Sequence, residues 1–130
     1  MNRMNVLILD RERDIGELFA RALETMKKYK CYYATNEEDA VALLKDMGFD
    51  LILADMSILS TGDFSLMRKI HRLCPGITIV AGAYNHQKEQ ITKALSYGAE
   101  AYFIKPIPIE ELRKRIDDLN IKANSSIRPE

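Results

Sequence analysis

Three charged residues stand where an apolar run of the sequence stops. Asp10, Asp55 and Lys105 each come directly after such a run. A carboxylate can act as a nucleophile or as a ligand of a hard cation, and a lysine offers a compact positive charge to an anion. Taken singly, each would be a solvated loop charge. Together they predict a functional site if the fold brings the three chain segments to one place.

Five short apolar runs alternate with five helical patterns along the chain. Short continuous apolar runs are typical of strands buried on both faces, and the segments between them repeat apolar residues with helical spacing. Strands joined by such crossover helices run parallel, with helices on both faces of the sheet. Five units predict a flavodoxin-like α/β fold, a three-layer sandwich with strand order 2-1-3-4-5. The predicted strands are residues 6–9, 31–34, 51–54, 77–81 and 101–104.

The predicted strand order determines where the charges meet. Strands one and three are neighbours, and the connections reverse direction between them. Ligands of such sheets bind in that crevice, at the carboxyl ends of the strands. Asp10, Asp55 and Lys105 follow the first, third and fifth strands, so the pattern predicts that they converge on this edge. Gly82 and Ala83 follow the fourth strand and belong to the same edge.

Local patterns also predict how the connecting helices begin and face. The apolar stripes of the first and fourth helices place Leu18 and Leu95 toward the sheet. Thr35 and Glu38 fit a capping box at the start of the second helix. Residues 56–63, between the third strand and the third helix, are predicted to be a loop.

Composition narrows the functional classes. Lys and Arg number 19 among 130 residues, and Asp and Glu also number 19, so there is no formal net charge. This balance argues against nucleic-acid binding driven by total charge, and no apolar run is long enough to span a membrane. The first residues lack a signal-peptide layout, which predicts a cytoplasmic protein. Residues 1–122 are expected to form one domain, and residues 123–130 a flexible tail or the start of a linker.

Four segments of the chain resemble the receiver domain of bacterial two-component response regulators. The resemblance runs from about Asn5 to Leu119, nearly the whole chain. Its most specific element is a Lys-Pro pair after a strand, preceded by an Ala-Leu-x-x-Gly-Ala helix end. The segments that carry it are Val6-Leu7-Ile8-Leu9-Asp10, Asp50-Leu51-Ile52-Leu53-Ala54-Asp55, Ala94-Leu95 with Gly98-Ala99, and Tyr102-Phe103-Ile104-Lys105-Pro106.

The resemblance implies a signalling mechanism. A histidine kinase or a phosphotransfer protein would pass a phosphoryl group to Asp55, whose carboxylate acts as the nucleophile. In the family Mg²⁺ assists, and the matching ligands here are Asp10, Asp55 and the backbone carbonyl of Ser57. Lys105 would contact the phosphoryl oxygens. No enzymatic activity is implied, and the sequence contains neither a Gly-rich phosphate loop after the first strand nor a nucleophile elbow.

The resemblance also implies an output. In the family, a Ser or Thr hydroxyl after the fourth strand moves to the phosphoryl group, and an aromatic residue on the fifth strand follows it inward. Tyr102 matches that aromatic position. The change would modulate binding of a downstream protein partner or an output domain. The expected surface is the face of the fourth helix, fifth strand and fifth helix, which includes Tyr97 and could also pair two copies of the chain.

Arg11 is the first departure from the family pattern, because it stands where a second acid usually binds the metal. Asp10 and Asp55 are balanced in charge by Lys105 and Arg11, so the Mg²⁺ site is expected to be weak or absent. Three interpretations stay open. Arg11 forms a bidentate pair with Asp55 and partly replaces Mg²⁺; or Glu12 swings inward as a substitute ligand; or Arg11 points to solvent beside a weakened metal site.

Gly82 is the second departure, because it stands at the switch position and has no side chain to move. The Tyr84 hydroxyl or the N–H of Ala83 is a nearby substitute. Without the family's hydroxyl, coupling between Asp55 and Tyr102 is expected to be weakened. Two functions therefore stay open: a receiver phosphorylated on Asp55 that switches partner binding, and a pseudo-receiver that binds partners without phosphorylation.

Overall fold

The computed structural model describes residues 3–121 as alternating strands and helices. The strands are β1 (Met4–Leu9), β2 (Tyr29–Ala34), β3 (Leu51–Asp55), β4 (Thr78–Ala83) and β5 (Ala101–Ile104). The helices are α1 (Arg13–Glu24), α2 (Glu37–Asp46), α3 (Met56–Leu59), α4 (Ser65–Leu73), the 3₁₀ turn η1 (Asn85–Gln87), α5 (Lys88–Ser96) and α6 (Ile109–Asp118). None of the helices within residues 3–121 is long and apolar enough to cross a membrane.

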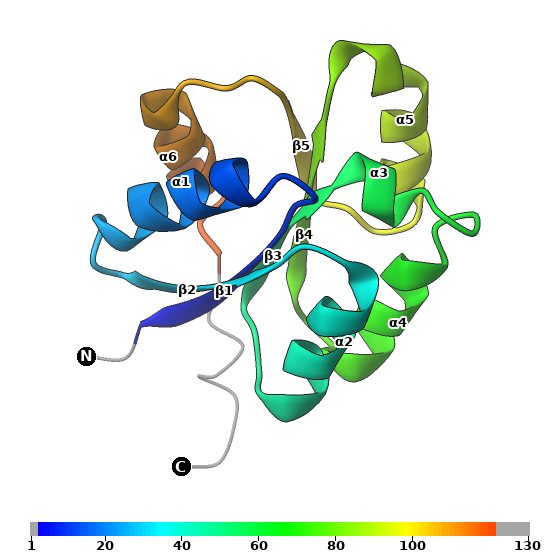
Figure 1. Cartoon of the computed structure of the whole chain (residues 1–130), viewed down its shortest axis with the longest axis horizontal. Coiled ribbons are helices and arrows are strands. Elements are labelled where there is room, and N and C mark those ends of the chain that lie inside the picture. Colours follow the sequence, from blue (N-terminus) through cyan, green and yellow to red (C-terminus); the bar gives the residue numbers. More distant parts are fainter. Residues whose placement is uncertain (1–2, 122–130) are drawn as a thin grey trace.

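The strands pair in parallel in the order β2-β1-β3-β4-β5, which confirms the predicted flavodoxin-like topology. Helices α1 and α6 cover one face of the sheet, and α2, α3, α4 and α5 cover the other (Figure 1). The carboxyl ends of all five strands therefore meet along one edge. The predicted domain boundary at residue 122 and the predicted tail at residues 123–130 lie outside the described part of the chain.

Side chains of the central strands alternate between two apolar cores. In β1, Leu7 and Leu9 belong to the core under α2, α3, α4 and α5, whereas Val6 and Ile8 belong to the core under α1 and α6. A parallel strand covered on both faces needs an apolar residue at every position, which explains the continuous apolar run. Because both cores are closely packed, the residues at the ends of β1 and β3 are held in fixed positions.

Two predicted core positions are wrong. Leu18 on α1 is 51% exposed and Leu95 on α5 is 40% exposed. Both residues lie at the margin of an apolar stripe that is wider than the strip of helix facing the sheet. On α1, Phe19 and Leu23 face the sheet and are buried. Helical periodicity therefore gives the buried face but not its width.

The starts of α2 and α3 also differ from expectation. Asn36, rather than Thr35 of a Thr–Glu capping box, caps α2 and accepts a hydrogen bond from the N–H of Asp39 at 2.8 Å. Asn is as effective as Thr in this role, so the sequence offers two adjacent candidates. The stretch predicted to be a loop at residues 56–63 begins with the short helix α3, whose N-cap is Asp55. This helix fixes the geometry at the end of β3.

Candidate functional site

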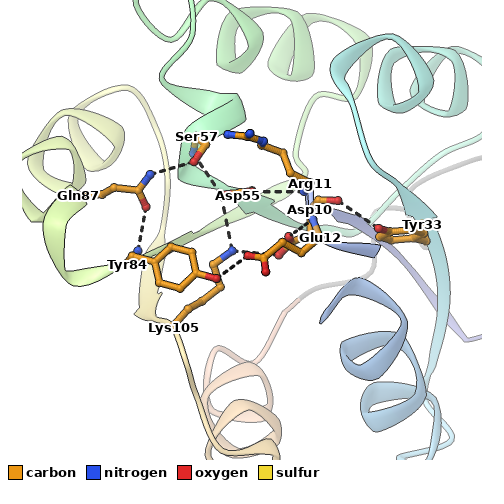
Figure 2. A network of polar contacts seen from close by, with 9 residues as sticks. All are labelled: Asp10, Arg11, Glu12, Tyr33, Asp55, Ser57, Tyr84, Gln87 and Lys105. Atoms are coloured by element: carbon orange, nitrogen blue, oxygen red, sulfur yellow. Dashed lines mark hydrogen bonds and ion pairs between the residues drawn. The ribbon is translucent and has the colours of Figure 1, made fainter. Parts of the chain in front are cut away.

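Asp10, Asp55 and Lys105 meet at the carboxyl edge of the sheet, as the strand order predicts (Figure 2). The Lys105 ammonium lies 3.1 Å from Oδ2 of Asp10 and 3.6 Å from Oδ1 of Asp55. All three residues are buried, with at most 4% of their surface exposed. Asp55 is the last residue of β3, whereas Asp10 and Lys105 directly follow β1 and β5. A buried lysine thus joins two buried carboxylates.

Backbone N–H groups hold the Asp55 carboxylate on both sides. The N–H of Ser57 donates to Oδ1 at 3.2 Å, because Asp55 caps the first turn of α3. The N–H of Arg11 donates to Oδ2 at 3.3 Å. These two donors and Lys105 hold the carboxylate in one position. A carboxylate held in one position at the end of a strand suits a nucleophilic role.

Asp10 is also held by hydrogen bonds, but its burial disfavours the charged form of its carboxyl group. Its Oδ1 accepts from the N–H of Glu12 at 2.8 Å, its Oδ2 accepts from Lys105, and its backbone carbonyl accepts from the Tyr33 hydroxyl at 3.2 Å. Burial raises the pKa of Asp10, and this outweighs the opposite effects of the Glu12 N–H and Lys105. Each of the four carboxylate oxygens of Asp10 and Asp55 therefore already has a donor or an ammonium beside it.

Replacement of Asp10 by Asn is expected to remove part of the pH dependence of stability. Because the folded-state pKa of Asp10 is raised above about 3.8, its contribution to stability is fully present below that value and is lost as the pH rises through the folded-state pKa. Urea unfolding at a series of pH values from about 3 to 7 should show this loss in the wild type and not in the variant. Equal pH dependence in both proteins would contradict this assignment.

Arg11 does not form the bidentate pair with Asp55 that the sequence allows. Within residues 3–121 its guanidinium makes no ion pair or hydrogen bond, and only its backbone N–H contacts Asp55. The side chain is exposed and extends from the end of β1 toward Ser57 (Figure 2). The side chain lines the same cleft as Asp55 and Ser57. The guanidinium is therefore a free cation near the mouth of the site.

An open cleft of about 340 Å³ leads to Asp55. Tyr84 covers one side: its ring centroid lies 4.8 Å from the Lys105 ammonium, and its hydroxyl donates to the Glu12 carboxylate. This hydrogen bond raises the pKa of Tyr84 to about 12. The Glu12 carboxylate thus reaches into the cleft and is bonded to Tyr84 (Figure 2). The cleft is lined by Arg11, Glu12, Asp55, Ser57, Tyr84, His86 and Gln87.

The 3₁₀ turn η1 fixes Tyr84 in place. The Gln87 side chain accepts from the Tyr84 backbone N–H at 2.8 Å and donates to the Ser57 hydroxyl at 2.9 Å. These bonds connect the end of β4 with the start of α3 across the cleft (Figure 2). With its backbone held in this way, Tyr84 donates its hydroxyl to Glu12.

Gly82 lies inside β4 and faces an aromatic ring. It pairs with Phe103 of β5, and a Cβ atom built on Gly82 would lie 2.7 Å from Cζ of Phe103. The ring therefore fills the volume that a Ser or Thr side chain would need. Ala83 is fully buried, and its carbonyl accepts from the Lys105 N–H at 2.8 Å. Tyr102, next to Phe103, points outward and is 40% exposed.

The sequence of this chain matches a known protein family. The family described as "Response regulator receiver domain" matches residues 6–117. The chain belongs to this family. This receiver domain is 34% identical over 113 residues to the phosphate regulon transcriptional regulatory protein PhoB of Pseudomonas aeruginosa, covering 85% of the chain and 49% of that protein. It is 26% identical over 120 residues to the transcriptional regulatory protein MalR of Bacillus subtilis, covering 92% of the chain and 51% of that protein. The chain thus spans about half the length of these curated relatives.

Solved structures agree with the receiver fold. A two-component response regulator from Clostridium difficile superposes with a TM-score of 0.79 at 29% identity, covering 91% of this chain and 96% of that one. A response regulator from Thermotoga maritima gives a TM-score of 0.81 at 23% identity, covering 90% and 97%. The second match supports the fold alone.

Receiver domains typically bind Mg²⁺, but the groups present in this one do not fit a divalent cation. Within residues 3–121, no group of three or more His, Cys, Asp or Glu side chains could hold a metal ion. The predicted carbonyl ligand, Ser57, belongs to α3 and accepts from the Thr61 hydroxyl at 3.0 Å. Helical carbonyls point toward the C-terminal end of their helix, so the N–H of Ser57, and not its carbonyl, faces Asp55. The remaining candidate ligands are the carboxylates of Asp10 and Asp55, and these are already bonded to Lys105 and to backbone N–H groups.

Sequence reasoning missed two contributors to this receiver site. Phe103 is recognisable only once β4 and β5 are aligned, although a glycine within a strand signals close approach of another group. Gln87 acts through its side chain from a 3₁₀ turn that carries no apolar pattern, and no sequence signal points to it.

Proposed function

We propose that this chain is a two-component signalling receiver that accepts a phosphoryl group on Asp55 and uses it to modulate partner binding. The observation that carries the proposal is the Asp55 carboxylate at the base of an open cleft, held by the Arg11 and Ser57 N–H groups and 3.6 Å from the Lys105 ammonium. This combination orients a nucleophile and places a cation where phosphoryl oxygens would lie.

The phosphoryl donor proposed is a phosphohistidine of a histidine kinase or phosphotransfer protein. An Asp55 carboxylate oxygen would bond to phosphorus while the bond between phosphorus and the histidine nitrogen breaks. The nitrogen keeps the electron pair and takes a proton from solvent. Lys105 would then attract the oxygens of the transferred group, and the two N–H groups would keep the carboxylate aimed at the cleft. The chain acts here as a signalling module, and no enzymatic activity is proposed.

The proposed output surface lies over α5, β5 and α6. It carries three exposed apolar side chains: Leu95, Tyr97 and Tyr102 are 40%, 37% and 40% exposed. Surface aromatic residues are common anchors in protein interfaces. The relatives are about twice as long as this chain, so an output domain, a separate protein and a second copy of the receiver are the partners to test.

Two observations favour a second candidate function, an interaction module that works without phosphorylation. Phe103 fills the space of a switch side chain at Gly82, so the usual route from Asp55 to Tyr102 has no moving hydroxyl. Arg11 replaces a carboxylate at the edge of the site. In this case the α5–β5–α6 surface would bind its partner with Asp55 unmodified.

Intact-mass measurement after incubation with a small phosphodonor separates the two functions. The wild type is expected to gain the mass of one phosphoryl group, and Asp55→Asn is expected to gain none, because the variant lacks the nucleophilic carboxylate. Asp50→Asn is not a suitable control, because Asp50 holds the backbone of Asn5. Asp46→Asn, at the exposed end of α2, should gain mass as the wild type does. No adduct on the wild type would favour the phosphorylation-independent module.

A further inference from the structure

The Arg11 guanidinium, which has no ion pair or hydrogen bond with residues 3–121, is the feature of the site that the proposed function does not use. Its backbone N–H holds Asp55, and its side chain lines the same cleft as Ser57, His86 and Gln87. Eight ion pairs join other charged residues of the described chain, and Arg11 is in none of them. A guanidinium that lines the approach to a nucleophile without a partner is placed to meet an incoming anion.

The charges of the site also indicate that Arg11 is placed to bind an anion. Two buried carboxylates share one ammonium, so the formal charges of the buried cluster leave one negative charge without a counterpart. A phosphoryl group brings further negative charge to this cluster, which makes an additional cation necessary. In this conformation the carbonyl of Ser57 accepts from Thr61 and the Glu12 carboxylate accepts from Tyr84, so the described residues, 3–121, do not build a divalent-cation site. Arg11 is the additional cation that the chain itself provides at the cleft.

We propose that Arg11 binds the oxygens of the phosphoryl group during its transfer to Asp55 and replaces a divalent cation in that task. This inference rests on the proposed function. Arg11 and Lys105 would contact the group from two sides, and the planar guanidinium can bind two phosphoryl oxygens at once. Phosphorylation of Asp55 should then proceed without a divalent cation.

The test uses the full chain with phosphoramidate as donor, followed by intact-mass measurement over time. In this reaction the bond between phosphorus and nitrogen breaks, a bond from phosphorus to an Asp55 oxygen forms, and the nitrogen leaves as ammonia after taking a proton. The wild type is expected to react at similar rates with EDTA and with MgCl₂. Arg11→Ala should react at least about tenfold more slowly in EDTA, because it loses charge-assisted hydrogen bonds. Arg21→Ala, an exposed arginine on α1, should match the wild type.

A binding measurement complements the rates. In Arg11→Asp a third carboxylate joins Asp10 and Asp55, so this variant should bind Mg²⁺ and react only when Mg²⁺ is present. The Ser57 amide resonance, followed during MgCl₂ titration, should shift in Arg11→Asp and stay in place in the wild type.

The outcomes separate this inference from the function on which it rests. Reaction of the wild type only with MgCl₂, together with an unchanged rate for Arg11→Ala, would overturn the role of Arg11 and leave Asp55 as the acceptor. Absence of any adduct in all conditions would overturn both. Retention of the full rate by Arg11→Lys would show that charge suffices and that bidentate binding is wrong.

Discussion

Replacement of Lys105 by methionine is expected to lower the free energy of unfolding by about 3–5 kcal/mol at neutral pH, the cost typical of breaking a buried ion pair on one side. Lys105 is 3% exposed and lies within 3.6 Å of both Asp10 and Asp55. Methionine retains the apolar stem but leaves two buried carboxylates that repel each other. Urea unfolding of the wild type and the variant measures the difference.

The pH dependence of that loss distinguishes electrostatics from packing. Without the ammonium, the pKa of Asp10 rises further, because Lys105 lowers it in the wild type. The folded variant then takes up protons more readily, so its deficit should shrink as the pH falls through the raised pKa. Lys93→Met, which breaks the exposed pair with Asp63, should leave stability unchanged. A deficit for Lys105→Met that is equal at acidic and neutral pH would contradict the account.

Replacement of Gly82 by threonine is expected to destabilise the fold by about 1–3 kcal/mol, although it restores the residue type common at this position in the family. A Cβ atom would lie 2.7 Å from Cζ and 3.0 Å from Cε2 of Phe103. The Phe103 ring cannot move away easily, because it is 3% exposed and packs edge-on against Phe19 with centroids 5.7 Å apart. Thermal or urea unfolding measures the loss.

A double variant tests whether the clash is the cause. Phe103→Leu alone should also destabilise the fold, because it leaves a cavity beside Gly82. Combined with Gly82→Thr, the smaller side chain makes room for the hydroxyl. The stability loss of the double variant should therefore be smaller than the sum of the losses of the two single variants. Strict additivity, or a stable Gly82→Thr single variant, would show that the Phe103 ring does not occupy the switch position.

The strand order and the meeting of Asp10, Asp55 and Lys105 could be predicted from the sequence. Continuous apolar runs separated by amphipathic helices leave few alternatives to a doubly wound parallel sheet. Once all strands are known to run parallel, the residues at their carboxyl ends must share an edge of the sheet.

The orientation of individual groups could not be predicted. Arg11 has several bonds to rotate, and charge counting alone could not decide whether its guanidinium or its N–H faces Asp55. The direction of the Ser57 carbonyl depends on α3, a helix of four residues without an apolar period. The occupation of the switch position depends on the pairing of Gly82 with Phe103, which involves residues 21 positions apart in the sequence. Periodicity in a sequence indicates which face of a helix or strand is buried. The orientations of these groups depend instead on how the strands and helices pack against one another in the folded chain.

The most direct test of the central claim is a phosphorus NMR spectrum of the wild type with phosphoramidate, recorded together with an amide spectrum of the same sample. We expect the resonance of an acyl phosphate and simultaneous shifts of the Arg11 and Ser57 amides, the two donors that hold the Asp55 carboxylate. The absence of an acyl phosphate resonance, or its appearance without change at these two amides, would contradict the assignment of Asp55 as the phosphoryl acceptor.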